Sequence, residues 1–363
     1  MSVTRAQIET ALKQYVDPYL EKVLIAANSV KNIAVDGGSV IVDVLLGFPA
    51  AGYHDTLSTK LKDIVKTVAG VTNVMVNITS NVVTHTVQKG VKPITGVKNI
   101  IAVASGKGGV GKSTVAVNLA LALSVEGARV GILDADIYGP SQPRMLGVMN
   151  AKPESSDGRS LDPINSYNLQ VMSIGFLVDQ DTPMIWRGPM VTQALTQLLN
   201  DTHWSELDYL VIDLPPGTGD IQLTLAQKVP VSGAVIVTTP QDIALLDAIK
   251  GLKMFEKVDV RVLGIVENMS THICSKCGHE EHIFGAGGGQ RMAADNKVPL
   301  LGSVPLEMSI RVQTDGGKPT VAAEPDGRIA LIYRDIARRV AAKLSMQAKD
   351  FSSKFPKIVI QNT

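Results

Sequence analysis

The sequence predicts an α/β fold in which helices cover both faces of a mostly parallel sheet, preceded by a small α+β domain. Short continuous apolar runs alternate with helical patterns, which is typical of strands buried on both faces. The runs are Ile100–Ala104, Val130–Leu133, Leu169–Ile174, Tyr209–Ile212, Gly233–Thr238, Val262–Val266 and Leu300–Val304. The helical patterns are Met190–Leu199, Ile243–Glu256 and Arg328–Leu344. With 363 residues, the chain is long enough for two domains.

The first part of the chain predicts the small domain, in the order helix, strand, strand, helix, strand. Helical periodicity over residues 4–27 is broken near Pro18, and a turn at Asp36-Gly37-Gly38 joins two strands that end at Leu46. An amphipathic helix over Thr56–Val68 and a strand over Val71–Ile78 follow. We therefore expect a small domain at 1–87, a linker at 88–97, a large domain at 98–350 and a tail at 351–363.

Composition narrows the class of protein. Apolar residues make up 45% of the chain and charged residues 19%, as in ordinary soluble globular proteins. The net charge of +1 gives no electrostatic reason to expect nucleic acid or an anionic membrane as a partner. The N-terminus lacks the apolar segment of a secretory signal, and no apolar run is long enough to span a membrane. We expect a cytoplasmic protein with no nucleic-acid or membrane partner.

A glycine-rich loop follows the first apolar run of the large domain and leads into a helical pattern. It reads Gly106-Lys107-Gly108-Gly109-Val110-Gly111-Lys112-Ser113-Thr114, which has the spacing of a phosphate-binding P-loop. Its backbone N–H groups and the start of the following helix are expected to face phosphate oxygens. Lys112 is expected to reach the β- and γ-phosphates, and the Ser113 hydroxyl to bind Mg²⁺. Residues 106–114 therefore predict a nucleoside triphosphate site.

Carboxylates end two of the apolar runs, at the edge of a parallel sheet where ligands bind. Asp213 ends one strand in the Walker-B arrangement, which predicts a second Mg²⁺ ligand. Asp134 and Asp136 end the strand after the P-loop helix, and Asp136 is the better candidate to orient the attacking water. The alternative is that both residues only form the turn after the strand. The glycines after Asp213 predict a loop that responds to the γ-phosphate.

The two cysteines of the chain form a C-x-x-C pair, Cys274 and Cys277. Two thiolates are half of a zinc or iron–sulfur site, and a disulfide framework is excluded. His279 or His282 would complete a zinc site within the chain. The pair would otherwise act as a redox disulfide, or two copies of the chain would supply four thiolates to one shared cluster. These three possibilities remain open from the residues alone.

The P-loop resembles a particular class of dimeric ATPases. Lys107 directly follows the first glycine, as in the deviant Walker-A loop of the nitrogenase iron protein, MinD and ParA class. The resemblance implies that ATP binds, that Lys107 acts on the nucleotide of the partner subunit, and that the protein is a homodimer. The sequences DADIYGP and DLPPGTGD then correspond to the two switch loops of that class. An added cation at the phosphates would stabilise transition-state charge, as an arginine finger does.

The order of the motifs resembles the Mrp/ApbC group of P-loop ATPases, related to Nbp35, which carry and transfer iron–sulfur clusters. The motifs are GKGGVGKST, DADIYGPS, DLPPGTGD, ENMS, the C-x-x-C pair and VPLE, after a MIP18-type domain. The resemblance implies an ATPase whose Cys274 and Cys277 bind a [4Fe–4S] cluster with the same residues of a second subunit. It implies that Asn268 reads the adenine ring, with Val304–Glu307 near the base. Its partners would be a cluster assembly scaffold and apo iron–sulfur proteins.

The sequence departs from this group in three respects, and two other functions remain as alternatives. Ser275 stands where members often have proline, the small domain has no cysteine, and no ferredoxin-like cysteine cluster precedes it. A ParA- or MinD-like positioning ATPase would need a basic DNA-binding face or an amphipathic membrane helix, and the tail with Pro356 lacks that pattern. A zinc or nickel metallochaperone would use the cysteines together with His279 and His282.

Overall fold

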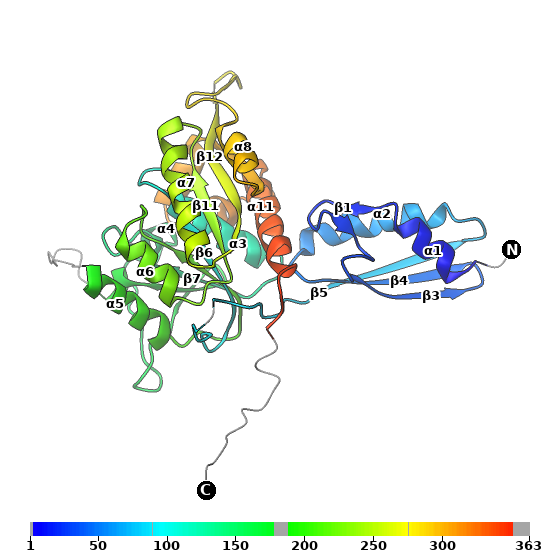
Figure 1. Cartoon of the computed structure of the whole chain (residues 1–363), viewed down its shortest axis with the longest axis horizontal. Coiled ribbons are helices and arrows are strands. Elements are labelled where there is room, and N and C mark those ends of the chain that lie inside the picture. The colour runs from blue at the N-terminus through cyan, green and yellow to red at the C-terminus, as the bar shows by residue number, and fades with distance from the viewer. Residues whose placement is uncertain (1–2, 89, 178–187, 275, 351–363) are drawn as a thin grey trace, which may run out of the picture.

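The computed structural model describes residues 3–88, 90–177, 188–274 and 276–350. Figure 1 shows a small N-terminal unit beside a larger unit that holds the central sheet. The chain passes from one to the other between Ser80 and Val97. The expected tail, 351–363, and Ser275 lie outside the described residues. No helix in the described part of the chain combines the length and apolar character that a membrane crossing requires.

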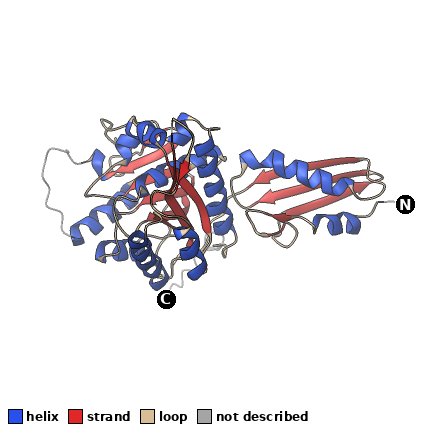
Figure 2. Cartoon of the chain, turned by 90° about the horizontal axis from the view of Figure 1, so that it is seen from above, coloured by secondary structure: helices blue, strands red, loops and turns tan. Residues whose placement is uncertain are grey.

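The small unit is a three-stranded sheet with helices on one face. Antiparallel β3 (Val30–Asp36) and β4 (Ser39–Leu46) form a hairpin, and β5 (Asn73–Ser80) pairs parallel with β4. Helices α1 (Arg5–Leu12) and α2 (His54–Lys66) pack on one side of this sheet, as Figure 2 shows. Alternate residues of β4 are buried beneath them, as the period of a half-buried strand requires. The predicted order of elements is confirmed.

The N-terminal helix is shorter than its periodicity predicts. After Leu12 the chain forms the short antiparallel pair β1 (Val16–Asp17) and β2 (Lys22–Val23). The Asp17 carboxylate is buried and accepts hydrogen bonds from the backbone N–H groups of Tyr19 at 3.0 Å and Leu20 at 2.9 Å. A side chain that bonds its own turn in this way competes with helix formation, and Pro18 removes a helical donor. A 3-10 turn over Ala51–Tyr53 precedes α2.

The large unit has the predicted mostly parallel sheet. Its strand order is β13-β12-β11-β6-β10-β7-β9-β8, with β14 paired to β12, and only β8 and β13 run antiparallel to their neighbours. The strands are β6 (Val97–Ala104), β7 (Val130–Asp134), β8 (Ile164–Ser166), β9 (Leu169–Ser173), β10 (Leu207–Asp213), β11 (Gly233–Thr238), β12 (Val262–Ile273), β13 (Glu280–Glu281) and β14 (Leu300–Leu306). The central strands are buried along their whole length, which explains their continuous apolar sequences.

Helices cover both faces of this sheet (Figures 1 and 2). One layer holds α3 (Lys112–Val125), α4 (Gln142–Met145), α9 (Met308–Asp315), α10 (Thr320–Ala323) and α11 (Arg328–Ser345). The other holds α5 (Gly188–Asp201), α6 (Asp220–Lys228), α7 (Asp242–Lys257) and α8 (Gly288–Asp295), and a 3-10 turn at Ile174–Phe176 follows β9. The short helix α4 lies between Tyr138 and Gly147 and has no counterpart among the predicted elements.

Glu126, at the C-terminal end of α3, joins the two units. Its carboxylate, with no exposed side-chain surface, bonds Arg334 at 2.7 Å and Arg338 at 2.6 Å, both on α11. The second carboxylate oxygen accepts the backbone N–H of Gly52 in the small unit at 3.0 Å. Arg338 also donates to the Tyr19 hydroxyl at 3.1 Å. Burial would raise the pKa of Glu126, but Arg338 and Arg334 outweigh it and hold the pKa below its ordinary value.

Replacing Glu126→Gln should lower the free energy of unfolding by about 3–5 kcal/mol at neutral pH, because two buried guanidinium groups lose their counter-charge. The lowered pKa means that the carboxylate stabilises the fold above the unfolded pKa of about 4.3. This contribution is lost as the pH falls through the folded value. Urea unfolding of both proteins from pH 7 to pH 3 should therefore show the difference shrinking below about pH 4.

The matched control is Glu256→Gln, which removes the exposed partner of Lys253 on α7. An exposed pair of this kind contributes about 0–1 kcal/mol, so the control should unfold nearly as the parent chain does. Equal effects of the two substitutions would contradict the role of Glu126 as the charge that joins the units.

Candidate functional site

The P-loop connects the central strand β6 to helix α3, as the sequence predicts. Gly111 precedes the helix in the left-handed region, at φ 80°, where a residue without a Cβ is favoured. The amide of Asn268, in the middle of β12, donates to the Val110 carbonyl at 2.9 Å. A Cβ on Gly111 would lie 2.2 Å from the Asn268 amide nitrogen. Asn268 therefore supports the loop backbone directly.

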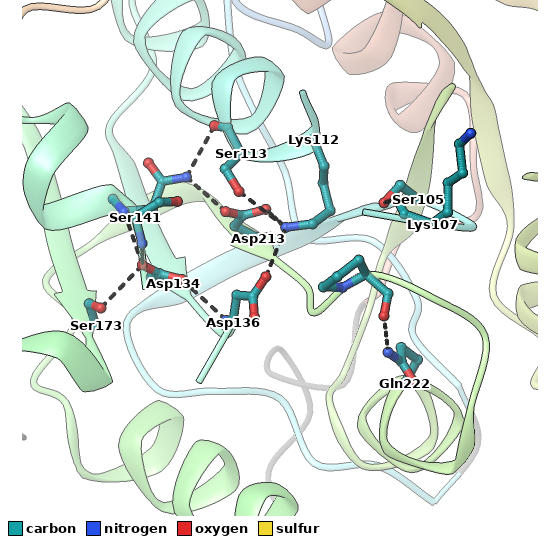
Figure 3. Close-up of polar contacts among 12 residues, drawn as sticks. Ser105, Lys107, Lys112, Ser113, Asp134, Asp136, Ser141, Ser173, Asp213 and Gln222 are labelled. Atoms are coloured by element: carbon teal, nitrogen blue, oxygen red, sulfur yellow. Dashed lines mark hydrogen bonds and ion pairs between the residues drawn. The ribbon is translucent and has the colours of Figure 1, made fainter. Parts of the chain in front are cut away.

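Lys112 and Asp213 form a buried ion pair at the start of α3 (Figure 3). The side chain of Lys112 is 6% exposed and that of Asp213 is fully buried. The Lys112 ammonium also lies 3.2 Å from the Ser113 hydroxyl and 4.0 Å from the Asp136 carboxylate. The structure thus brings together the four residues that the sequence assigns to the phosphates, the metal and the attacking water.

Gln142 is a member of this cluster that the sequence analysis missed. Its amide donates to the second carboxylate oxygen of Asp213 at 2.9 Å and to the Ser113 carbonyl at 3.1 Å. It belongs to α4, directly after the DADIYGPS stretch, so only its place behind that motif could have pointed to it. Gln142 orients the carboxylate of Asp213 toward Lys112 and Ser113.

Asp134 and Asp136 have different environments, although both follow β7. The buried carboxylate of Asp134 accepts the backbone N–H groups of Asp136, Ser141 and Gln142 and the Ser173 hydroxyl, at 2.9 to 3.2 Å. Burial, together with the charge of Asp213, raises the pKa of Asp134 to about 7. Through these hydrogen bonds, Asp134 stabilises the loop that runs from Asp136 to Gln142. Asp136 keeps 14% of its side chain exposed, and burial raises its pKa while Lys112 lowers it.

The DLPPGTGD stretch, one of the two predicted switch loops, lies against the P-loop. The backbone N–H of Gly217, in the DLPPGTGD stretch, donates to the Ser105 carbonyl at 3.0 Å. Gln222 on α6 donates to the Pro216 carbonyl and ties the same loop to its helix (Figure 3). The DLPPGTGD stretch is therefore hydrogen-bonded to the residue that directly precedes the P-loop.

Lys107 lies apart from this cluster. The Ser105 hydroxyl bonds its carbonyl oxygen at 2.9 Å, and its side chain extends away from Lys112 and Asp213 in Figure 3. Its ammonium forms no ion pair with another residue of the described ranges. The Lys107 ammonium therefore points away from the Lys112–Asp213 pair of its own chain.

The cysteine pair lies at the end of β12, which extends far beyond the predicted Val266. Cys274 follows the last residue of this strand, and Figure 1 shows the loop projecting past α7 and α8. Because β11 pairs parallel with both β6 and β12, the P-loop and this loop follow the same edge of the sheet. Backbone N–H groups of Lys276 and Cys277 bond the Cys274 sulfur and hold the pKa of that thiol below its ordinary value.

The two nearby histidines do not join the cysteines in a metal site. His282 Nδ1 lies 3.2 Å from the Ser270 carbonyl oxygen, and His279 Nε2 lies 3.6 Å from the Glu281 carboxylate. Across the described ranges, no group of three or more His, Cys, Asp and Glu side chains is close enough to hold a metal ion. The described loop therefore offers two thiol ligands and an exposed approach to Cys277.

The VPLE stretch lies beside Asn268. Val304 on β14 is in register with Asn268, and its carbonyl accepts the Ser270 hydroxyl at 3.1 Å. Glu307 then bonds Arg328, the first residue of α11, at 2.7 Å. The residues expected near the adenine are therefore neighbours, while the roles of Asn268 and VPLE toward the base stay predictions.

Gly111→Ala should lower the melting temperature more than Gly109→Ala does. Both glycines have a positive φ, at 80° and 81°, which costs an alanine about 1–2 kcal/mol. A Cβ on Gly109 meets nothing within 4 Å, whereas one on Gly111 displaces the Asn268 amide from Val110. Thermal unfolding of the single variants and of Gly111→Ala/Asn268→Ala tests this, because the double variant should recover part of the loss. An equal shift for both glycines would contradict the contact.

Comparison with known proteins identifies the family to which the chain belongs. The family model for NUBPL iron-transfer P-loop NTPases matches residues 96–341, and the model for iron-sulfur cluster assembly proteins matches residues 5–76. The iron-sulfur cluster carrier protein of Escherichia coli K12 is 51% identical over 345 residues, which cover 95% of this chain and 94% of that protein. The iron-sulfur cluster transfer protein NUBPL of Mus musculus is 52% identical over 255 residues, 70% of this chain and 80% of that protein.

A solved structure supports the same assignment. The nucleotide-binding protein of Archaeoglobus fulgidus, in complex with ADP, is 38% identical with a TM-score of 0.57. The match covers 64% of this chain and 90% of that one. The strand, loop and helix around Lys112 agree with the matches along both units, and the chain belongs to the family of NUBPL-type iron-transfer P-loop NTPases.

Proposed function

We propose that this chain is an ATP-hydrolysing carrier that binds an iron–sulfur cluster between two copies of itself and transfers it to apo-proteins. The observation that carries the proposal is the cysteine pair, with Cys277 exposed, at the same sheet edge as the P-loop. The relatives named as cluster carrier and cluster transfer proteins support it. The partners would be a cluster assembly scaffold and apo iron–sulfur proteins in the cytoplasm.

The cargo follows from the number and state of the thiols. A [4Fe–4S] cluster held by protein takes four thiolates, and the described loop supplies two. A two-fold axis through a homodimer would bring a second Cys274 and Cys277 to the same cluster. The backbone N–H groups at the Cys274 sulfur favour the thiolate, which is the form that binds iron. The shared site supports a cluster that is delivered rather than retained, since separation of the subunits would open it.

The residues around the P-loop fit a magnesium nucleotide. Ser113 and Asp213 offer hydroxyl and carboxylate oxygens, the ligands that Mg²⁺ prefers, and Gln142 fixes the carboxylate. When bound, magnesium offsets the negative charge of the phosphates. Lys112 would bind the phosphate oxygens, and Asp136, with part of its carboxylate exposed, would orient the attacking water. Asp134 would serve to hold the loop that carries Asp136.

Lys107 would complete the site of the other subunit. Its side chain extends away from its own Lys112 and Asp213, so it is available to a nucleotide bound across a dimer interface (Figure 3). A cation placed there would stabilise charge that develops during phosphoryl transfer. ATP would then link the two subunits and set the distance between the two cysteine pairs.

Cys274→Ser/Cys277→Ser should abolish cluster binding and leave nucleotide binding intact. Anaerobic reconstitution followed by iron and sulfide analysis and Mössbauer spectroscopy measures the loss and identifies the cluster type. The matched control is His279→Ala/His282→Ala, which should bind a cluster as the parent chain does. Zinc retained by the freshly purified chain, and lost in the histidine variant, would instead favour a metallochaperone.

Mixing two inactive variants tests whether Lys107 acts across the dimer. Lys107→Ala and Lys112→Ala should each lose most ATP hydrolysis. In a mixed dimer, the Lys107→Ala subunit keeps its own Lys112 and receives Lys107 from the other chain, so one site should recover. Random exchange of equal amounts makes about half of the dimers mixed, each with one complete site of two, so we expect mixing to restore up to about a quarter of the parent rate. A mixture as inactive as its components, with exchange of subunits verified by mass, would place Lys107 in its own site and contradict the proposal.

A further inference from the structure

A cavity of about 370 Å³ lies where the small unit meets the end of α11. Its walls come from β2 and the turn after it, from the ends of neighbouring strands, and from the last residues of α11 and the chain that follows. Figure 1 shows this end of α11 beside the small unit. The volume is within the range of small-molecule sites. No described residue that lines the cavity belongs to the P-loop cluster or to the cysteine loop, so the cavity is separate from both.

Contacts between the two units fix the shape of this cavity. Gly47, just after β4, lies so close to α11 that a Cβ added to it would be 3.1 Å from the Ser345 Cβ. Both residues line the cavity. Arg338, earlier on the same helix, bonds Tyr19 of the small unit at 3.1 Å and Glu126 at 2.6 Å. The cavity is therefore a feature of the two units together.

Three lysines line the cavity, and none of its described lining residues is acidic. They are Lys22 on β2, Lys31 on β3 and Lys349 after α11. No ion pair among the described residues includes any of them. The Lys31 ammonium donates to the carbonyl of Asn28, another lining residue, at 2.7 Å. Because like charges repel one another, these ammonium groups favour an anion beside them.

The acidic residues next to Lys22 and Lys349 in the sequence do not line the cavity. Glu21 precedes Lys22, but its carboxylate accepts a hydrogen bond from the Lys343 ammonium at 2.6 Å. Asp350 follows Lys349, and its backbone N–H donates to the Thr84 carbonyl at 3.0 Å. The positive charge of the cavity is therefore not offset by a carboxylate of its own walls.

Ser29 adds a buried hydroxyl group to the wall of the cavity. The residue is 5% exposed, its N–H bonds the Leu24 carbonyl, and its carbonyl accepts the Leu45 N–H, both at 2.8 Å. The preceding Asn28 has the left-handed backbone that closes the turn, at φ 54°. The Ser29 hydroxyl forms no hydrogen bond with another described residue. A buried polar group without a partner is costly, so this hydroxyl is a fixed group that a polar ligand would satisfy.

We propose that this cavity binds a small molecule that carries phosphate groups, at a site distinct from the nucleotide and cluster sites. An ammonium group binds phosphate oxygens as a point charge, and the Ser29 hydroxyl offers a donor of fixed position. The cavity has the size of a small-molecule site, which favours such a ligand over the surface of another protein. Because its walls come from both units, the bound anion would hold the small unit to the end of α11.

Lysine acetylation of the full chain, followed by peptide mass spectrometry, tests this with pyrophosphate as the probe. Sodium chloride keeps the ionic strength equal in all samples. Pyrophosphate should slow acetylation of Lys22, Lys31 and Lys349 at least about tenfold, because a neighbouring anion favours the ammonium over the reactive free amine. The exposed Lys13 and Lys60 of the small unit, outside the cavity, should react at unchanged rates.

Two substitutions relate this protection to the cavity. Lys22→Gln/Lys349→Gln should raise the pyrophosphate concentration that protects Lys31 by at least about tenfold, whereas the matched control Lys13→Gln/Lys60→Gln should not change it. Ser29→Ala should weaken protection by about tenfold, since a hydrogen bond to a charged group contributes roughly that factor. Without pyrophosphate, Ser29→Ala should not lower the melting temperature, because the hydroxyl bonds no other described residue.

The same protection in a Lys112→Ala chain would show that the nucleotide site is not its source, and its loss there would overturn the proposal. Equal slowing at Lys13 and Lys60 would overturn it too, because a general ionic effect would then explain the result. Protection by an oligoglutamate peptide, at concentrations where pyrophosphate gives none, would assign the cavity to an acidic protein segment and contradict a phosphate site.

Discussion

The buried ion pair of Lys112 and Asp213 is the interaction on which the rest of the site depends. Removing both charges from water costs several kcal/mol each, and the cost is met only when geometry and further hydrogen bonds are good. That geometry comes from the sheet, because β10 lies between β6 and β7 and its register puts Asp213 level with Val103 and Asp134. Gln142 supplies the remaining hydrogen bond. The order of the strands thus creates the site before any ligand binds.

Much of this arrangement could be predicted from local sequence. Continuous apolar runs indicate strands buried on both faces, and glycine spacing before Lys112 indicates a phosphate loop, because both signals lie within a few residues. The fold class and the order of elements in the small unit were predicted correctly. The extent of β12 was not, since its last residues, from Glu267 to Ile273, are mostly polar and pair with β14 only in the folded sheet.

Contacts between distant segments were beyond such reasoning. Gln142 carries no motif of its own, and its role appears only when α4 packs beside α3. Asn268 is assigned to the adenine by resemblance, and the bond of its amide to the P-loop at Val110 was not predicted. The helical periodicity continues beyond Leu12, but the Asp17 side chain bonds the backbone of the following turn, which competes with a helix. In each case the deciding partner lies in another segment or in a turn that periodicity does not describe.

Helix α3 has a buried charge at each end, and this makes it a mechanical link between the two units. Lys112 lies in its first turn at the phosphate loop, and Glu126 caps its last turn against Gly52 of the small unit. Its fourteen residues span roughly 21 Å and ten of them are buried, so the helix is a continuous packed connection between the two ends. A displacement of the first turn on phosphate binding would therefore reach Glu126 and its contact with Gly52 in the small unit. One helix thus connects the nucleotide site to the small unit, through Lys112 at its start and Glu126 at its end.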